Sequence, residues 1–159
     1  MNLRYLCANH RQWLMSDARR AEQAWLDWLE RGSLLCEEGQ FAEAVPFLGC
    51  AFELADFLLG ARAPGYSVAA MRFTDSARLL IDAYRQRGDS GHANYVLVTS
   101  SSRLARELAD RARYQLTADC IRTLYTAEAS IPEPWRGRVR DARAGGVQAA
   151  VGSAATRLH

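Results

Sequence analysis

Residues 25–51, WLDWLERGSLLCEEGQFAEAVPFLGCA, contain the pattern that decides the fold. Apolar or small residues recur every three or four positions before Gly39, and the same spacing resumes after it. This spacing places them on one face of an α-helix, and a glycine after the last turn is a common helix stop. The stretch therefore predicts two amphipathic helices joined by a turn at Gly39.

The same periodicity continues in both directions along the chain. Upstream, residues 11–38 contain no proline and only Gly32 as an internal glycine, so the pattern predicts one long helix. Downstream, the glycines and the proline of residues 60–65 predict a loop. A third helix is expected over residues 68–87, with Gly88 as its stop.

Residues 91–130 contain neither a proline nor an internal glycine. The cluster 99–102, Thr-Ser-Ser-Ser, has weak helix propensity, so the segment forms either one long helix or two. No sustained alternation of apolar and polar residues occurs anywhere, which excludes a sheet. The fold class is therefore predicted to be all-α, built from helical hairpins, with an irregular four- or five-helix bundle as the alternative.

Charge divides the chain into two parts. Residues 1–131 hold 15 arginines against 16 carboxylates, whereas residues 132–159 hold five arginines against two. We expect a helical domain over 1–131 and a basic, flexible tail rich in Gly, Ala and Arg over 132–159. The net charge of +2 excludes a strongly basic histone-like protein. The tail is either simply solvated or a weak nucleic-acid contact through its clustered arginines, Arg136, Arg138, Arg140 and Arg143.

An internal repeat links the two predicted turns. When Gly39 is aligned with Gly88, the flanking segments match at an offset of 49 residues. In both copies an alanine lies five positions after the glycine and a leucine four positions further on. A small residue at this point lets the returning helix of a hairpin approach the first helix closely.

The residues of this repeat resemble the tetratricopeptide repeat (TPR). Its signature, Trp-x2-Leu-Gly-x2-Tyr followed by Ala-x3-Phe, is matched in the first copy by Trp28, Arg31, Gly32, Leu35, Ala44 and Leu48. The second copy has Ala77, Leu80, Ile81, Tyr84, Ala93 and Leu97 at the same positions. The offset of 49 residues departs from the TPR period of about 34, and neither copy ends in the expected proline.

The resemblance implies a protein-interaction role and a set of contact residues. The first helix of each hairpin would line a groove that holds a partner's peptide or helix. The outward positions would be Leu26, Leu29, Ser33 and Cys36 in the first copy and Asp75, Arg78, Asp82 and Arg85 in the second. In the competing interpretation, the charged stripe is a solvated helix face whose charges pair with one another. The implied role is an adaptor, regulator or chaperone.

Tryptophans give a second set of candidate contacts. Trp28 occupies a TPR core position, whereas Trp13 and Trp25 either extend the core or form an exposed interface. An alternative function follows from the second option: a homodimeric structural bundle that buries Trp25, Leu26 and Leu29 between two copies.

Other chemistry has little support in the sequence. The four cysteines have no CxxC spacing, and Cys7 with His10 supplies too few ligands for a zinc site. No nucleophile-elbow, P-loop, zinc-protease or dinucleotide motif occurs, so we expect neither an enzyme nor a cofactor. We also expect no membrane span and no signal peptide, and hence a cytoplasmic protein. The absence of lysine and the abundance of alanine favour a GC-rich bacterial genome.

Overall fold

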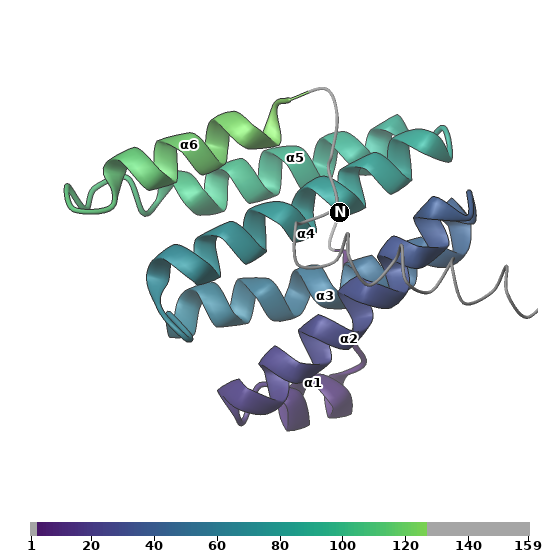
Figure 1. The fold of residues 1–159 in the computed structure, drawn as a ribbon, viewed down its shortest axis with the longest axis horizontal. Helices are drawn as coiled ribbons and strands as arrows, with labels where there is room; N and C mark the ends of the chain where they lie inside the picture. The colour runs from purple at the N-terminus through teal and green to yellow at the C-terminus, as the bar shows by residue number, and fades with distance from the viewer. Residues whose placement is uncertain (1–2, 127–159) are drawn as a thin grey trace, which may run out of the picture.

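The computed structural model describes residues 3–126, and this part of the chain forms six α-helices and no strand. In chain order they are α1 Ala8–Leu14, α2 Ala18–Glu37, α3 Phe41–Ala61, α4 Tyr66–Gln86, α5 Ser90–Ala105 and α6 Tyr114–Leu124. Helices α2 and α3 form one hairpin, α4 and α5 form a second, and α6 packs against both α4 and α5 (Figure 1). The predicted all-α fold class is confirmed.

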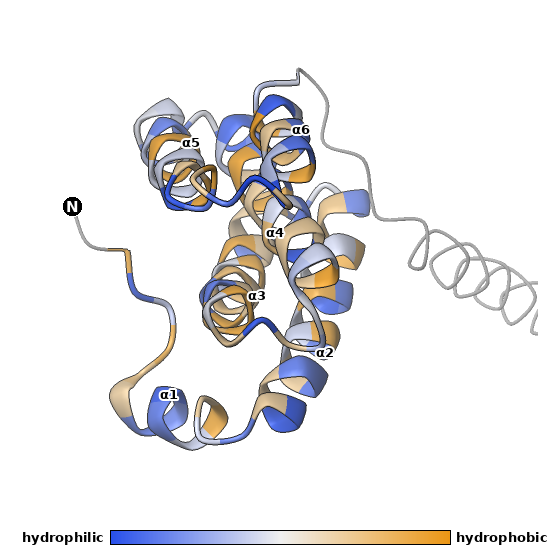
Figure 2. Cartoon of the chain, turned by 90° about the vertical axis from the view of Figure 1, so that its left-hand side faces the viewer, coloured by the Kyte–Doolittle hydropathy of each residue, from blue (hydrophilic) through white to orange (hydrophobic). Residues whose placement is uncertain are grey.

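Helix α4 lies at the centre of this arrangement and contacts α2, α3, α5 and α6. Figure 2 shows α3 and α5 on one side of it and α2 and α6 on the other. The largest fully buried side chains include Phe73 and Leu80 of α4, Leu54 of α3 and Leu104 of α5. The fold therefore presents two different outer faces, one formed by α3 and α5 and one by α2 and α6.

The two hairpin turns have the same backbone geometry. Gly39 and Gly88 have φ of 75° and 79°, in the left-handed region that favours glycine. The amide N–H after each glycine donates to the carbonyl five residues back, Gln40 to Leu35 and Asp89 to Tyr84, both at 2.8 Å. This hydrogen bond belongs to the Schellman motif, which satisfies the last carbonyls of a helix. Both predicted stops are therefore confirmed, at the predicted offset.

The single helix predicted over residues 11–38 is wrong, because the chain breaks between α1 and α2. Asp17 has extended backbone angles, φ −144° and ψ 117°, and its carboxylate accepts the amide N–H of Arg19 at 2.9 Å. This is an N-cap, which starts a new helix and satisfies a donor that has no intrahelical partner.

The segment over residues 91–130 contains two helices as far as residue 126, and the break is not at the serine cluster. Ser100 lies inside α5, where its hydroxyl donates to the carbonyl of Val96 at 2.6 Å. This bond to the preceding turn keeps a weak helix former within the helix. The break falls at residues 106–113, a turn in which the Asp110 carboxylate accepts the N–H of Ala112 at 3.0 Å.

Helix α3 is long and strongly apolar, and the expectation of no membrane span stays a prediction for it. It is long and apolar enough by length and composition to cross a membrane, with a mean hydropathy of 1.6 over its best window. Half of that window is buried inside the fold, where α3 packs between α2 and α4. Its composition is therefore accounted for by its place in the core.

The first hairpin is held together by a close contact between its helices. A Cβ added to Gly32 of α2 would lie 2.5 Å from Cδ2 of Leu48 on α3. Leu48 is itself fully buried, so its side chain has little room to move away. The glycine at this position is therefore required by packing rather than by backbone conformation.

Candidate partner-binding face and an arginine-rimmed pocket

The predicted contact residues of α2 divide into buried and accessible ones. Leu29 and Ser33 are fully buried, and the Ser33 hydroxyl donates to the carbonyl of Leu29 at 2.7 Å. The prediction that they point outward is wrong. Ala21 and Leu29, eight residues apart, both lie on the buried face of α2, so this stripe of the helix points at the core. Leu26 and Cys36 are half-buried and remain accessible.

Cys36 and Asp82 show that the predicted positions of α2 and α4 approach each other. Burial raises the pKa of the Cys36 thiol to about 11, and the nearby carboxylate of Asp82 adds to the shift. An electrostatic effect of this kind requires the two groups to be close. The structure therefore brings this pair of predicted residues together across the interface between the hairpins.

The charged stripe of α4 is not a uniformly solvated face. Asp75, Arg78 and Asp82 are half-buried, and only Arg85 is exposed. Burial raises the pKa of Asp75 to about 6, although the charge of Arg78 opposes the shift. Helix α6 packs over this part of α4 and leaves a crevice of only about 10 Å³ beside Arg78 and Arg85. A partner side chain does not fit into that space.

Of the two alternatives for Trp25, the structure shows that it extends the core and is not an exposed interface residue. Its side chain is 4% exposed, and its indole N–H donates to the Ser76 hydroxyl of α4 at 2.9 Å. The guanidinium carbon of Arg72 lies 4.7 Å from the ring centroid. Trp13 differs, because 57% of it is exposed. The guanidinium of Arg20 lies over one face of its ring. Trp28 packs against the core, as expected for its position.

A groove of about 260 Å³ lies between the amino-terminal halves of α2 and α4. Leu26 is part of its wall, and an ion pair of 2.8 Å between Arg72 and Glu22 crosses it. Arg19 and Gln23 complete the polar rim. The sequence patterns did not indicate these polar residues, since nothing in the spacing of α2 shows which part of α4 lies opposite.

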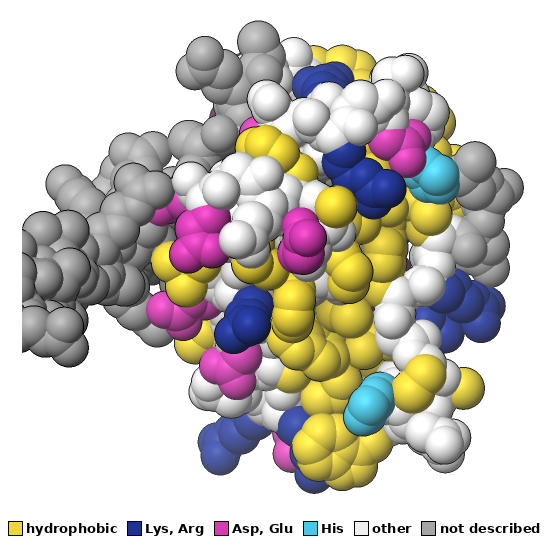
Figure 3. Space-filling view, turned by 90° about the vertical axis from the view of Figure 1, so that its right-hand side faces the viewer, with side chains coloured by type: hydrophobic (Ala, Val, Ile, Leu, Met, Phe, Trp, Pro, Cys, Tyr) yellow, Lys and Arg dark blue, Asp and Glu magenta, His cyan; other side chains and the backbone are white. Residues whose placement is uncertain are grey.

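Hydrophobic side chains also reach the surface outside this groove. Figure 3 shows a band of them running down the right-hand end of the molecule, with carboxylates along one edge. Contiguous apolar surface of this kind is more common at interaction sites than on the rest of a monomer.

A cavity of about 410 Å³ lies on the other face of the molecule, where the amino-terminal segment crosses α3 and α5. Glu53 of α3 holds this segment in place. Its carboxylate accepts the amide N–H of Tyr5 and that of Leu6, the latter at 3.1 Å, and it pairs with Arg11. The segment therefore forms a fixed wall of the pocket rather than a loose end.

Arginines surround this pocket. Arg103 pairs with Asp56 at 3.0 Å and with Glu107 at 3.0 Å, and Arg11 pairs with Glu53. Arg4 and Arg106 also line the pocket; both are exposed, and neither forms an ion pair within residues 3–126. No sequence pattern pointed to this site, because its residues come from positions far apart in the chain.

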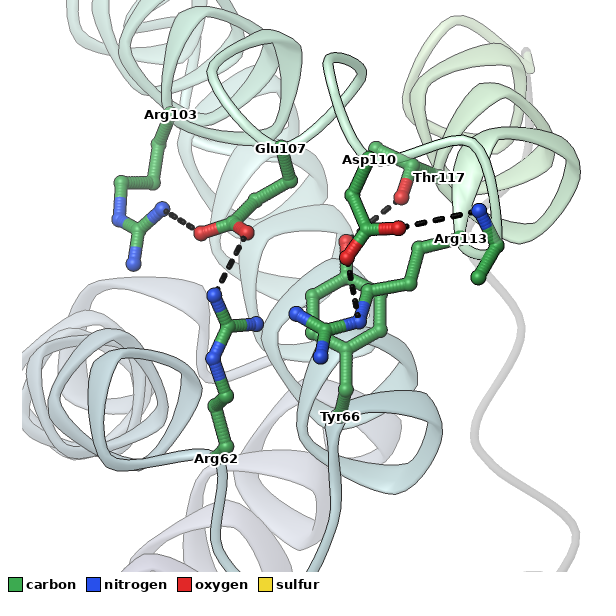
Figure 4. Close-up of polar contacts among 8 residues, drawn as sticks. Arg62, Tyr66, Arg103, Glu107, Asp110, Arg113 and Thr117 are labelled. Carbon is green, nitrogen blue, oxygen red and sulfur yellow. Dashed lines mark hydrogen bonds and ion pairs between the residues drawn. The ribbon is translucent and has the colours of Figure 1, made fainter.

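A network of polar contacts beside the pocket joins the α3–α4 turn to residues 106–113 (Figure 4). Glu107 accepts from Arg62 at 3.3 Å and from Arg103 at 3.0 Å. Although burial raises the pKa of Glu107, the bond from Arg103 and the two positive charges bring it below its ordinary value. The guanidinium carbons of Arg62 and Arg113 lie 5.4 and 4.7 Å from the ring centroid of Tyr66.

The hydroxyl of Tyr66 completes this network. It lies 2.6 Å from the hydroxyl of Thr117 on α6, and both residues are buried. Because the four arginine and glutamate side chains described above already have partners, we assign the network a structural role: it holds α6 against α4.

The described part of the chain contains no candidate metal-binding site. No group of three or more His, Cys, Asp or Glu side chains able to hold a metal ion occurs within residues 3–126. Cys7 and His10 do meet, with Sγ and Nδ1 3.3 Å apart. The four cysteines, all within this range, are free thiols. The arginines of the basic tail over residues 132–159 lie outside the described residues.

Comparisons of the chain with protein-family models, with curated proteins and with solved structures gave no significant match.

Proposed function

We propose that this protein is a TPR-like module that binds another protein, as an adaptor, regulator or chaperone. The observation that carries the proposal is the groove between α2 and α4, which has an apolar wall at Leu26 and a charged rim. It lies where two hairpins with equivalent turns pack side by side. Stacked helical hairpins commonly provide extended surfaces for peptides and helices.

The charges around this groove suggest how a partner would bind. Arg19 is exposed and lines the groove together with Leu26, whereas Arg85, in the last turn of α4, lies outside it. An amphipathic helix would place an apolar side chain against Leu26 and a carboxylate against Arg19, whose planar guanidinium group binds a carboxylate with two hydrogen bonds. The half-buried Asp75, Arg78 and Asp82 would support this face rather than contact the partner.

A homodimer would need a surface other than Trp25 and Leu29. Trp25 and Leu29 are already buried within one chain, so a second copy is not required to cover them. Of the residues considered, Leu26 and Trp13 remain accessible.

Affinity capture from cells that express the protein naturally tests the proposal. Leu26→Asp and Arg19→Glu, both in the lining of the groove, should each lose partners that the wild-type chain retains. Val98→Asp and Arg111→Glu are matched controls, because Val98 and Arg111 are exposed and lie outside the α2–α4 groove. Recovery of identical partners by all five proteins would contradict the proposal.

A further inference from the structure

We propose that the pocket between the amino-terminal segment, α3 and α5 binds a small organic anion that has an apolar body. The body would lie on Phe52 and Phe73, and the acidic group would contact Arg4 and Arg106. This site is on the opposite side of α4 from the α2–α4 groove (Figure 2) and does not depend on the proposed partner binding.

The floor of the pocket is aromatic and rigid. The rings of Phe52 and Phe73 stack with centroids 5.3 Å apart and an interplanar angle of 28°. Phe73 and Val96 are 1% exposed, so the floor belongs to the core and does not shift with the surface. A volume of about 410 Å³ lies within the range of small-molecule sites, which are typically apolar with a few polar groups at the edge.

The rim of the pocket carries an excess of positive charge. Its ionisable side chains are four arginines and two carboxylates. The two carboxylates, Glu53 and Asp56, already pair with Arg11 and Arg103. Arg4 and Arg106 therefore supply the positive charge that remains uncompensated among the described residues, and their guanidinium groups suit a carboxylate, sulfonate or phosphate.

The amino-terminal segment, which forms one wall of the pocket, is held in place without a ligand. The amide groups of Tyr5 and Leu6 are held by Glu53, and the hydroxyl of Tyr5 lies 2.7 Å from that of Tyr84. Arg4 precedes this anchored pair directly, so its backbone is fixed close to the pocket. A ligand would then lose little affinity to ordering of the protein.

Two fluorescent probes of nearly the same shape test the proposal on the full chain. Anilinonaphthalenesulfonate has aromatic rings and an anionic group, whereas phenylnaphthylamine has the same rings and no charge. We expect the sulfonate to bind saturably at a single site, more weakly as salt is added. Arg4→Gln combined with Arg106→Gln should weaken sulfonate binding by about tenfold or more, and leave binding of the neutral probe unchanged.

Two further variants test whether the probes bind in this pocket and whether the loss of any two arginines would have the same effect. Thr99→Trp, at an exposed position lining the pocket, should fill it and reduce binding of both probes. Arg111→Gln combined with Arg122→Gln removes two exposed arginines elsewhere and should change neither. The proposal would be overturned if the two double-arginine variants bound the sulfonate with equal affinity. Undiminished binding of the probes to Thr99→Trp would also overturn it. Near-ultraviolet circular dichroism of each variant verifies that the fold is intact.

Discussion

Gly49 of α3 lies directly against the aromatic ring of Tyr5, so closely that a Cβ at position 49 would overlap the ring. This contact fixes the amino-terminal segment to α3, and the hydrogen bond between the hydroxyls of Tyr5 and Tyr84 ties it to α4. Burial, followed by that hydrogen bond, raises the pKa of Tyr5 far above its ordinary value. The amino-terminal segment is therefore part of the packed structure and forms a wall of the pocket.

Gly49→Ala should destabilise the protein by about 1–3 kcal/mol, because the added methyl group must displace the Tyr5 ring. Urea unfolding measures the free energy, and hydrogen exchange at the amides of Tyr5 and Leu6 should become faster. Gly60→Ala is the matched control on the same helix, since the nearest atom to its added Cβ is 3.9 Å away at Arg103. Equal stability of the two variants would show that Tyr5 does not pack here.

Gly39→Ala and Gly88→Ala should each cost about 1 kcal/mol, because alanine is strained at a positive φ. Neither added Cβ has another atom within 4 Å, so backbone strain is the only expected cost. The double variant should show the sum of the two effects in urea unfolding. Gly65→Ala, at φ −164° and equally open, should cost less than either. Clearly unequal costs at positions 39 and 88 would contradict the equivalence of the turns.

Asp75 should make stability depend on pH. Its folded-state pKa of about 6 exceeds the unfolded value. Its contribution to the free energy of unfolding is therefore full below about pH 4 and is lost as the pH rises through 6. Relative to Asp75→Asn, the wild-type protein should therefore lose about 3 kcal/mol of unfolding free energy across this range. Chemical unfolding of both proteins at several pH values measures this difference. A pH-independent difference would contradict the burial of this carboxyl group.

The thiols should differ sharply in reactivity. Burial raises the pKa of both Cys36 and Cys50 to about 11 and also raises that of Cys120, so few of these thiols are ionised near neutral pH. Cys7 is exposed. A chromogenic disulfide reagent should show one fast-reacting thiol per chain, and Cys7→Ser should remove that fast phase. Persistence of the fast phase in Cys7→Ser would place the reactive thiol elsewhere.

The sequence predicted the hairpins because their stops depend on local geometry. Gly39 and Gly88 need only their own left-handed backbone and the helix before them. No glycine or proline marks the break at Asp17. The same holds for residues 106–113, where Glu107 pairs with Arg62 and Asp110 accepts the N–H of Ala112. Helix boundaries of this kind are decided by capping and packing as much as by composition.

The candidate sites were harder to foresee, because they depend on which helix faces meet. The repeat register predicts that Leu29 points outward, but in the structure α2 turns that side towards the core. The pocket combines Arg4, Phe73 and Arg106, which lie far apart in the chain and share no motif. Their proximity follows only from the packing of the amino-terminal segment against α3 and α5.

Site-specific photo-crosslinking tests the proposed partner binding most directly. A photoreactive phenylalanine analogue would be placed at Leu26, in the groove between α2 and α4, or at Val98, which is 60% exposed on α5. In cells that express the protein naturally, we expect a discrete crosslinked protein from position 26 that Arg19→Glu reduces, and none from position 98. The same products from both positions, undiminished by Arg19→Glu, would contradict binding at this groove.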